Sequence, residues 1–221
     1  MDKEFIYNFS AEPTGTHMLL LGQVAPNSKV LDIGCAAGYL GKYLAVEKQC
    51  EMWGIEPDKD AVEMAKQNSY KFLLNKNIEE ALHDPALAGQ EFDYILLGDV
   101  LEHLLYPERI LELLKILIRK NGKLLVSLPN VAHYSVRFSL LKGKWDMKDS
   151  GIMDRTHLHF YTVKTAKALL EKQGWKVEAI RPRGDLERWF RKIGLEKIGQ
   201  KVLFLFPEFF SIQFIFTASL K

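Results

Sequence analysis

Short apolar runs alternate with helix-like segments through the first half of the chain. Between residues 28 and 128, runs such as 52–55 and 92–97 are almost wholly apolar, as expected for strands that are buried on both faces. The segments between these runs place apolar residues at helical spacing, as in 107–118, which begins with a proline. Strand and helix alternate five times in this way, and the pattern predicts a parallel, doubly wound α/β sheet.

The pattern is less regular outside this region. Residues 1–13 look irregular, and 142–156 form a loop rich in Gly, Asp and Lys. Asn121-Gly122 is expected to end the helix over 107–118. The further elements expected are helices over 14–24, 131–141 and 162–173, and strands over 123–128, 175–180 and 211–220. We expect the first two of these helices to lie over a ligand pocket.

An insertion at about 184–210, between the last two strands, is longer than a hairpin requires. It is rich in Phe, Leu and Ile and contains one Trp, with Arg and Lys residues between them. Three interpretations compete: a lid packed on the domain, a contact in a homodimer, and a basic amphipathic surface that touches a membrane lipid. Packing is the favoured interpretation, and no apolar run is long enough to span a membrane.

The most informative stretch of the chain is 29–41. An apolar run ends in Asp32, five small residues occupy 34–38, and a helical pattern begins at Tyr39. Small residues let the backbone approach a ligand, and the N-terminus of a helix offers free N–H groups. The nearby acid disfavours a bare phosphate and favours a zwitterionic ligand with hydroxyl and amine groups.

Two other interpretations of this loop compete with a zwitterion site. The dinucleotide-binding fingerprint requires glycines where this chain has Ala36 and Tyr39, which disfavours a nicotinamide-dependent oxidoreductase. An ordinary turn between strand and helix would bind no ligand, and Asp32 beside five small residues argues against it.

Other polar residues follow the ends of neighbouring predicted strands. Glu56 ends a strand twenty-four residues after Asp32, where an acid can accept hydrogen bonds from a ribose. Because ligands of open α/β sheets bind beyond the carboxyl ends of the strands, Gly34, Glu56 and Gly98 should meet at one site.

The four segments 30–38, 54–58, 92–104 and 121–130, in this order, closely resemble the class I S-adenosylmethionine-dependent methyltransferases. Within that superfamily the chain most resembles small bacterial enzymes related to the ubiquinone-biosynthesis O-methyltransferases, and 154–162 also resembles a segment of that group. The resemblance implies one methyltransferase domain over 1–221, with a Rossmann-like, seven-stranded, mostly parallel sheet whose last strand is antiparallel. Ala37 departs from the family, which has a glycine or a small polar residue there.

The resemblance also implies which residues contact S-adenosylmethionine, with S-adenosylhomocysteine as the product. At the adenine, Asn77-Ile78 takes the place of the Asp and apolar residue common in the family, although Asn77 is equally suited to capping a helix. The expected cofactor contacts are Asp32, Gly34, Cys35, Ala36, Gly38, Glu56, Pro57, Asn77, Ile78, Gly98 and Asp99.

An oxygen nucleophile needs a base, and His103 is the first candidate because it follows the strand end at Gly98. His157, or His133, can approach from later loops. Asp99, Glu102, His103 and His157 also resemble the metal site of the small-RNA 2′-O-methyltransferases. That family has Glu at the position of Asp99, so a metal-free site is expected.

The leading hypothesis is an enzyme that methylates a small molecule at oxygen, with a quinone-like phenol or a sugar as the acceptor. The alternative is a catalytically silent scaffold that binds S-adenosylmethionine.

Composition fits this hypothesis. A chain of 221 residues suits one α/β domain, and 30 basic against 28 acidic residues are not typical of nucleic-acid binding. Two cysteines make no disulfide framework, and the N-terminus does not resemble a signal peptide, so a cytoplasmic protein is expected.

Overall fold

A seven-stranded sheet forms the centre of the protein. The computed structural model describes residues 12, 15–184, 186, 190 and 194–221. The strands are β1 (Lys29–Ile33), β2 (Glu51–Ile55), β3 (Phe72–Leu74), β4 (Phe92–Gly98), β5 (Ile118–Pro129), β6 (Trp175–Arg183) and β7 (Gln213–Leu220). Their order in the sheet is β3-β2-β1-β4-β5-β7-β6. All neighbouring pairs are parallel except those of β7, which is antiparallel to both β5 and β6. The expected doubly wound sheet with an antiparallel last strand is confirmed.

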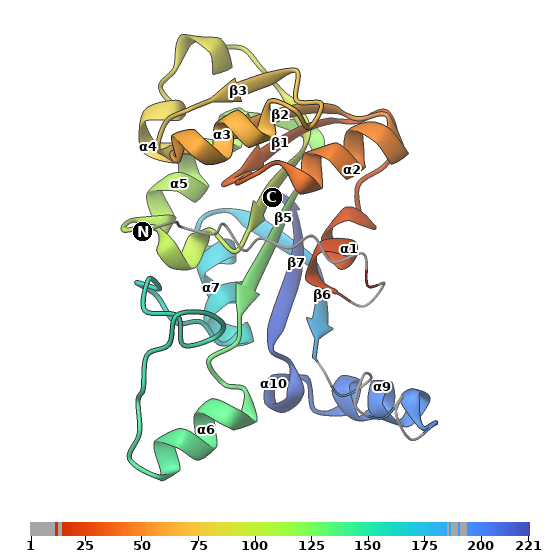
Figure 1. Ribbon diagram of the computed structural model, residues 1–221, viewed down its shortest axis with the longest axis vertical. Helices are drawn as coiled ribbons and strands as arrows, with labels where there is room; N and C mark the ends of the chain where they lie inside the picture. Colours follow the sequence, from red (N-terminus) through yellow and green to blue (C-terminus); the bar gives the residue numbers. More distant parts are fainter. Residues whose placement is uncertain (1–11, 13–14, 185, 187–189, 191–193) are drawn as a thin grey trace.

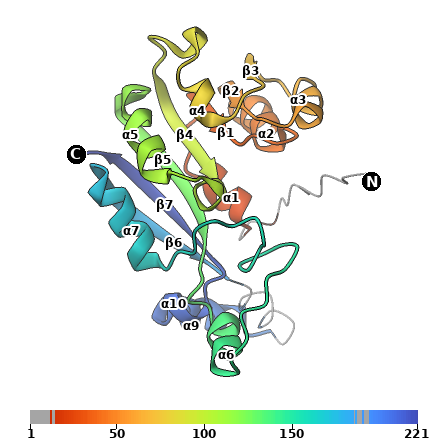
Figure 2. The same cartoon turned by 90° about the vertical axis from the view of Figure 1, so that its left-hand side faces the viewer.

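Helices cover both faces of this sheet (Figures 1 and 2). The described helices are α1 (Thr16–Leu21), α2 (Tyr39–Lys48), α3 (Lys59–Ala65), α4 (Ile78–Ala81), α5 (Pro107–Leu113), α6 (Tyr134–Leu141), α7 (Val163–Lys172), α9 (Glu196–Leu205) and α10 (Pro207–Phe210). Short 3₁₀ turns add η1 (Pro85–Leu87), η2 (Leu101–His103) and η3 (Leu114–Ile116). One apolar core joins the sheet to α5 and α7, and a second joins it to α1 and α2.

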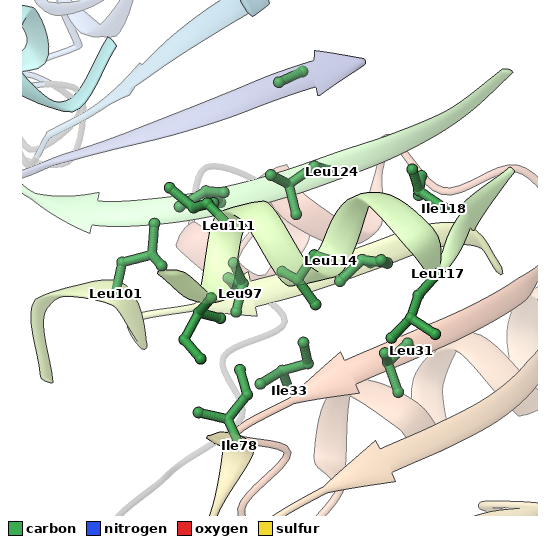
Figure 3. Close-up of a cluster of buried hydrophobic side chains, with 14 of the residues drawn as sticks. Leu31, Ile33, Ile78, Leu97, Leu101, Leu111, Leu114, Leu117, Ile118 and Leu124 are labelled. Carbon is green, nitrogen blue, oxygen red and sulfur yellow. The ribbon is translucent and has the colours of Figure 1, made fainter. Parts of the chain in front are cut away.

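The larger core shows why the strands read as continuous apolar runs. Leu31, Ile33 and Leu97 from β1 and β4 meet Leu111 of α5 and Leu114 of η3 (Figure 3). These side chains are at most 2% exposed. Because the opposite face of the same strands packs on α1 and α2, neither face needs polar residues.

The expected helix over 107–118 is too long. It ends at Leu113, a 3₁₀ turn follows, and Ile118 already begins β5, paired with Phe92 of β4. Asn121-Gly122 therefore lies inside a strand rather than at a helix end. A Cβ on Gly122 would lie 2.8 Å from the Ile118 side chain and 2.9 Å from the Phe92 carbonyl, so the close approach at this irregular pairing requires glycine.

Two other helices begin later than expected. The helix expected over 131–141 begins at Tyr134, because the His133 ring nitrogen accepts the Ser135 N–H and caps it. The first helix begins at Thr16 rather than residue 14, and residues 1–11, 13 and 14 lie outside the described part of the chain. The helix expected over 162–173 is confirmed, with a capping box between Thr162 and Thr165.

Helices α9 and α10 follow β6 and precede β7 in the sequence. In space they lie at the same end of the molecule as α6 (Figure 1). Phe209 of α10 packs against Tyr134 and Phe138 of α6, with ring centroids 5.8 and 6.3 Å apart. The side chains of 204–206 are mostly exposed. Contact of this segment with lipid or with a second copy stays a prediction, and its residues 185, 187–189 and 191–193 lie outside the described ones. Among the described helices, none is long and apolar enough to cross a membrane.

Candidate functional site

A cavity of about 450 Å³ runs along the carboxyl ends of the parallel strands. Its wall takes residues that follow β1, β2, β3 and β4 and is completed by Ser127 of β5 and by α1. This is the edge at which open α/β sheets bind their ligands. Nine of the residues expected to contact a cofactor line it: Gly34, Cys35, Ala36, Glu56, Pro57, Asn77, Ile78, Gly98 and Asp99.

The conformation of the loop after β1 is fixed by its glycine and by backbone hydrogen bonds. Gly34 has φ +69°, and a Cβ there would lie 2.8 Å from the Val100 side chain. The N–H groups of Gly34 and Cys35 both donate to the Ile55 carbonyl, at 2.8 and 3.2 Å. These two loop donors are therefore engaged within the protein. The free N–H groups that the sequence predicts belong to the first turn of α2, which begins at Tyr39, and they stay a prediction.

Glu56 fixes the same loop from the end of β2. Its Oε2 accepts the Ala36 N–H at 2.9 Å and its Oε1 accepts the Asp58 N–H at 2.9 Å. The side chain is only 9% exposed and still lines the cavity. Each carboxylate oxygen has a second lone pair, so Glu56 can also accept hydrogen bonds from two ligand hydroxyls.

Asp32 and Gly38 do not line the cavity. Asp32 is buried beneath it and accepts the Tyr70 hydroxyl at 2.6 Å. Gly38 is the left-handed residue before α2, and a Cβ there would lie 2.9 Å from the Tyr70 ring. Both residues support the loop from behind, so direct ligand contact is not expected from either.

Burial raises the pKa values of two groups of this region, Asp32 and Cys35. Burial raises the pKa of Asp32 to about 7, against the Tyr70 hydrogen bond, which lowers it. Burial and the nearby Asp32 and Glu56 carboxylates also raise the pKa of the Cys35 thiol. The thiol therefore stays protonated, which agrees with Cys35 being a small loop residue rather than a nucleophile.

Asn77 and Ile78 follow β3 at the far end of the cavity. The Asn77 side-chain oxygen accepts the Glu80 N–H at 2.8 Å and caps α4, which is the alternative that the sequence left open. Both residues nevertheless line the cavity, so Ile78 and the Asn77 amide group remain available to a ligand there.

Asp99 lies at the other end of the cavity, in a conformation rare for a residue with a side chain (φ +56°). Its Oδ1 accepts hydrogen bonds from the Ser127 hydroxyl, at 2.9 Å, and from the Gln213 amide. Burial raises the pKa of Asp99, whereas these two donors lower it, as do the nearby imidazoles of His17 and His103.

His17 lines the cavity and was not identified from the sequence. Burial lowers its pKa, Asp99 opposes that effect, and Arg183 adds to it. No motif marks this residue. The only signal was the expectation of a helix across the pocket, which brings one face of α1 to the cavity.

His103 lines the cavity, and His157 lies against it with ring centroids 4.8 Å apart. The His103 Nδ1 is 3.2 Å from the Thr156 carbonyl. His157 is not itself in the cavity wall, and burial and the His103 imidazole lower its pKa. His133, the third histidine considered, caps α6 and is not part of the wall.

Glu102 completes a compact group with these two histidines. One ligand atom from each of Glu102, His103 and His157 lies within 4.8 Å of the others. Glu102 is buried, no described donor bonds to either carboxylate oxygen, and burial together with Asp99 raises its pKa well above the usual range. Asp99 is not part of this group, because Ser127 and Gln213 hold it elsewhere.

Comparisons with known proteins agree with this geometry. Residues 12–180 match the family described as "Methyltransferase domain". The chain is 30% identical over 102 residues to a ubiquinone biosynthesis O-methyltransferase of Coxiella burnetii, a match that covers 46% of this chain and 43% of that protein. It is 33% identical over 108 residues to the protein of that name in Glaesserella parasuis, and this match covers 45% of that protein. The chain thus spans less than half the length of these relatives.

The fold has a counterpart among solved structures. A SAM-dependent methyltransferase from Archaeoglobus fulgidus superposes with a TM-score of 0.64 over 94% of this chain and 95% of that one, at 19% sequence identity. An identity this low supports the fold alone.

Proposed function

The chain belongs to the methyltransferase domain family, and we propose that it uses S-adenosylmethionine to methylate a hydroxyl group of a small molecule. The cavity fits the cofactor by the chemistry of its wall. Glu56 is placed for the ribose hydroxyls, Asn77 and Ile78 for the adenine, and the small residues of the β1 loop for close approach of the sulfur end. This order puts the adenosine near β2 and β3 and the reacting end near β4.

S-adenosylmethionine, when bound, supplies a methyl group already activated on a sulfonium sulfur. The protein therefore has to align the attacking oxygen with the methyl carbon, exclude water and remove a proton. A hydroxyl oxygen methylated in this way would lose its proton, which a basic side chain of the cavity would have to accept.

The proposal rests on the position and the tautomer of His103. The Thr156 carbonyl 3.2 Å from Nδ1 favours the tautomer with the proton on that nitrogen, which leaves the Nε2 lone pair for a substrate hydroxyl. His103 lines the cavity beside Gly98 and Asp99, at the proposed reacting end. We assign His103 the role of base, and His157 the role of holding its ring in place.

Glu102, His103 and His157 also fit a divalent ion, since Glu102 is a buried carboxyl group without a hydrogen-bond donor. An ion there would hold the acceptor oxygen and lower its pKa. We propose that the site works without one. Asp99, the fourth ligand that the family resemblance implies, is bonded to Ser127 and Gln213, and burial favours the protonated form of Glu102.

The matched relatives carry a name that refers to O-methylation in ubiquinone biosynthesis. A quinone-like phenol, or a sugar hydroxyl, is the acceptor that we propose. Both present an oxygen whose proton a histidine can remove in the transition state.

The test is transfer of a labelled methyl group from S-adenosylmethionine to a panel of catechols, quinols and nucleotide sugars. We expect a labelled methyl ether from at least one class, and a loss of about 100-fold in kcat for His103→Gln, the usual scale for a general base. His83→Gln, which changes an exposed histidine outside the cavity, is the control. Methylation at nitrogen or carbon, or binding of S-adenosylhomocysteine without transfer to any acceptor, would contradict the proposal. The second result would favour the silent scaffold.

A further inference from the structure

The cavity wall carries acids but, among its described residues, no lysine or arginine. Glu56, Glu79 and Asp99 line it, and within the described part of the chain the only lining side chains able to carry a positive charge are His17 and His103. The amino-acid end of S-adenosylmethionine carries both a carboxylate and an ammonium group. Among the described wall residues, the candidates for pairing with its carboxylate are therefore these two histidines.

The loop after β1 offers little to that carboxylate. The N–H groups of Gly34 and Cys35 donate to Ile55, and that of Ala36 donates to Glu56. The two lining imidazoles at the reacting end can also donate, and His103 already has its Nδ1 at the Thr156 carbonyl.

The residue before His17 is linked to Asp99 through Gln213. Its neighbour Thr16 donates from its hydroxyl to the Gln213 side-chain oxygen, and the Gln213 amide donates to Asp99 Oδ1. One turn further along α1, the Leu20 side chain lies 3.7 Å from where a Cβ on Gly98 would be. This helix therefore lies over the end of β4, and His17 and Asp99 face the same part of the cavity.

Asp99 is held with one oxygen engaged. Ser127 and Gln213 both bond to Oδ1, and no described donor bonds to Oδ2. The left-handed backbone at Asp99 is costly for a residue with a side chain, and such strain is concentrated at functional sites. The second oxygen is free to accept a hydrogen bond from a ligand.

We propose that His17 and Asp99 together bind the amino-acid end of S-adenosylmethionine. The His17 imidazole donates to the carboxylate, and Asp99 Oδ2 accepts from the ammonium group. An Asp–His pair complements a zwitterion without adding net charge when both groups are ionised. The inference rests on the cofactor of the family and not on the identity of the acceptor or of the methylated atom.

The test is calorimetric titration of the apo protein with two ligands. S-adenosylhomocysteine carries the amino-acid end, whereas 5′-methylthioadenosine has the same adenosine and sulfur but only a methyl group beyond them. We expect His17→Leu to weaken binding of S-adenosylhomocysteine by about 10- to 100-fold, the scale of a lost hydrogen bond to a charged group. Binding of 5′-methylthioadenosine should change less than about twofold, because its contacts are elsewhere. Asp99→Asn should show the same selectivity, since an amide cannot offer the ammonium group a charged acceptor.

His83→Leu is the matched control, and it should alter neither affinity. An equal loss for both ligands would show that His17 only supports α1, and unchanged binding of both ligands would place the carboxylate elsewhere, for example at the N-terminus of α2. Either result overturns the proposal. If the unaltered protein binds neither ligand, the cofactor assignment is wrong and this subsite falls with it. If both ligands bind but no acceptor is methylated, the proposed function fails while the subsite stands or falls on the ratio.

Discussion

Gly34 is constrained both by its left-handed backbone and by its close contact with Val100. Gly143 has the same backbone conformation without such a contact, so a comparison of the two glycines separates the two effects. Gly34 and Gly143 both have φ +69°, but a Cβ on Gly34 would lie 2.8 Å from Val100, whereas a Cβ on Gly143 would meet nothing within 4 Å. Gly143→Ala should cost about 1–2 kcal/mol of unfolding free energy, from backbone strain alone. Gly34→Ala should cost more and should also weaken binding of S-adenosylhomocysteine. Chemical unfolding of both variants measures the difference, and equal losses would contradict the contact with Val100.

Glu56 serves the fold and the ligand at once. Glu56→Gln keeps one carbonyl oxygen but replaces the other acceptor by a donor, which faces either the Ala36 or the Asp58 N–H. We expect a loss of about 1–3 kcal/mol in binding S-adenosylhomocysteine, and a smaller loss of stability. Calorimetry and thermal melting measure the two effects. Unchanged affinity in a folded variant would remove Glu56 from the ribose site.

At the scale of elements, Tyr70 connects three of them: its hydroxyl bonds to Asp32 of β1, and its ring packs against α2 and β2. The Tyr70 ring fills the space left by Gly38, Gly41 and Gly54, since a Cβ on any of them would lie within 3 Å of it. Its hydroxyl reaches Asp32 at 2.6 Å. Tyr70 thereby supports the cofactor loop from behind.

This pair predicts a pH dependence of stability. The pKa of Asp32 is about 7 in the folded protein and about 3.9 in an unfolded chain. The folded state therefore binds the extra proton between these values, and the contribution of Asp32 to stability falls as pH rises from about 4 to about 7. Asp32→Asn removes this slope, so the variant should gain stability relative to the unaltered protein on going from pH 5 to pH 8.5. Denaturant unfolding at the two pH values measures the gain, and a constant difference would contradict the raised pKa.

The elements that the sequence predicted well are those with a single strong signal. Buried strands such as 92–97 have apolar runs that nothing else explains, and Thr162 carries a capping motif. The boundary between α5 and β5 failed because Asn121-Gly122 looks like a helix end, whereas the close packing of Gly122 against Ile118 and Phe92 depends on a neighbouring strand. His17 escaped notice for the same reason: the helix that carries it is linked to Asp99 through Gln213, which bonds to Thr16 and is 197 residues away from it in the sequence.

At the scale of the whole molecule, the chain brings distant segments to one end of the cavity. The loop before α7 returns so that the N–H groups of Leu158 and His159 donate to the Glu102 carbonyl, which places His157 against His103. The sequence identified the residues that follow each strand because parallel strands end at one edge. It did not show that Asp32 and Gly38 lie behind the cavity wall, since that depends on where the Tyr70 ring packs.

The metal-free interpretation makes a prediction for the assembled site. Dialysis against a chelator should leave methyl transfer unchanged, and Glu102→Gln should retain activity within about threefold, because the amide resembles the protonated acid that burial favours. Activity measured with an acceptor from the panel tests both points. Loss of activity with chelator, restored by Mg²⁺ or a transition metal, would show that Glu102, His103 and His157 hold an ion.

The central claim is that one cavity along the strand ends holds the cofactor in a defined direction. A crystal structure of the complex with S-adenosylhomocysteine tests it most directly. We expect the ribose hydroxyls on Glu56, the adenine beside Asn77 and Ile78, and the amino-acid end between His17 and Asp99, with the sulfur facing His103. A ligand bound outside this cavity, or one reversed so that its adenine lies beside His17, would contradict the account.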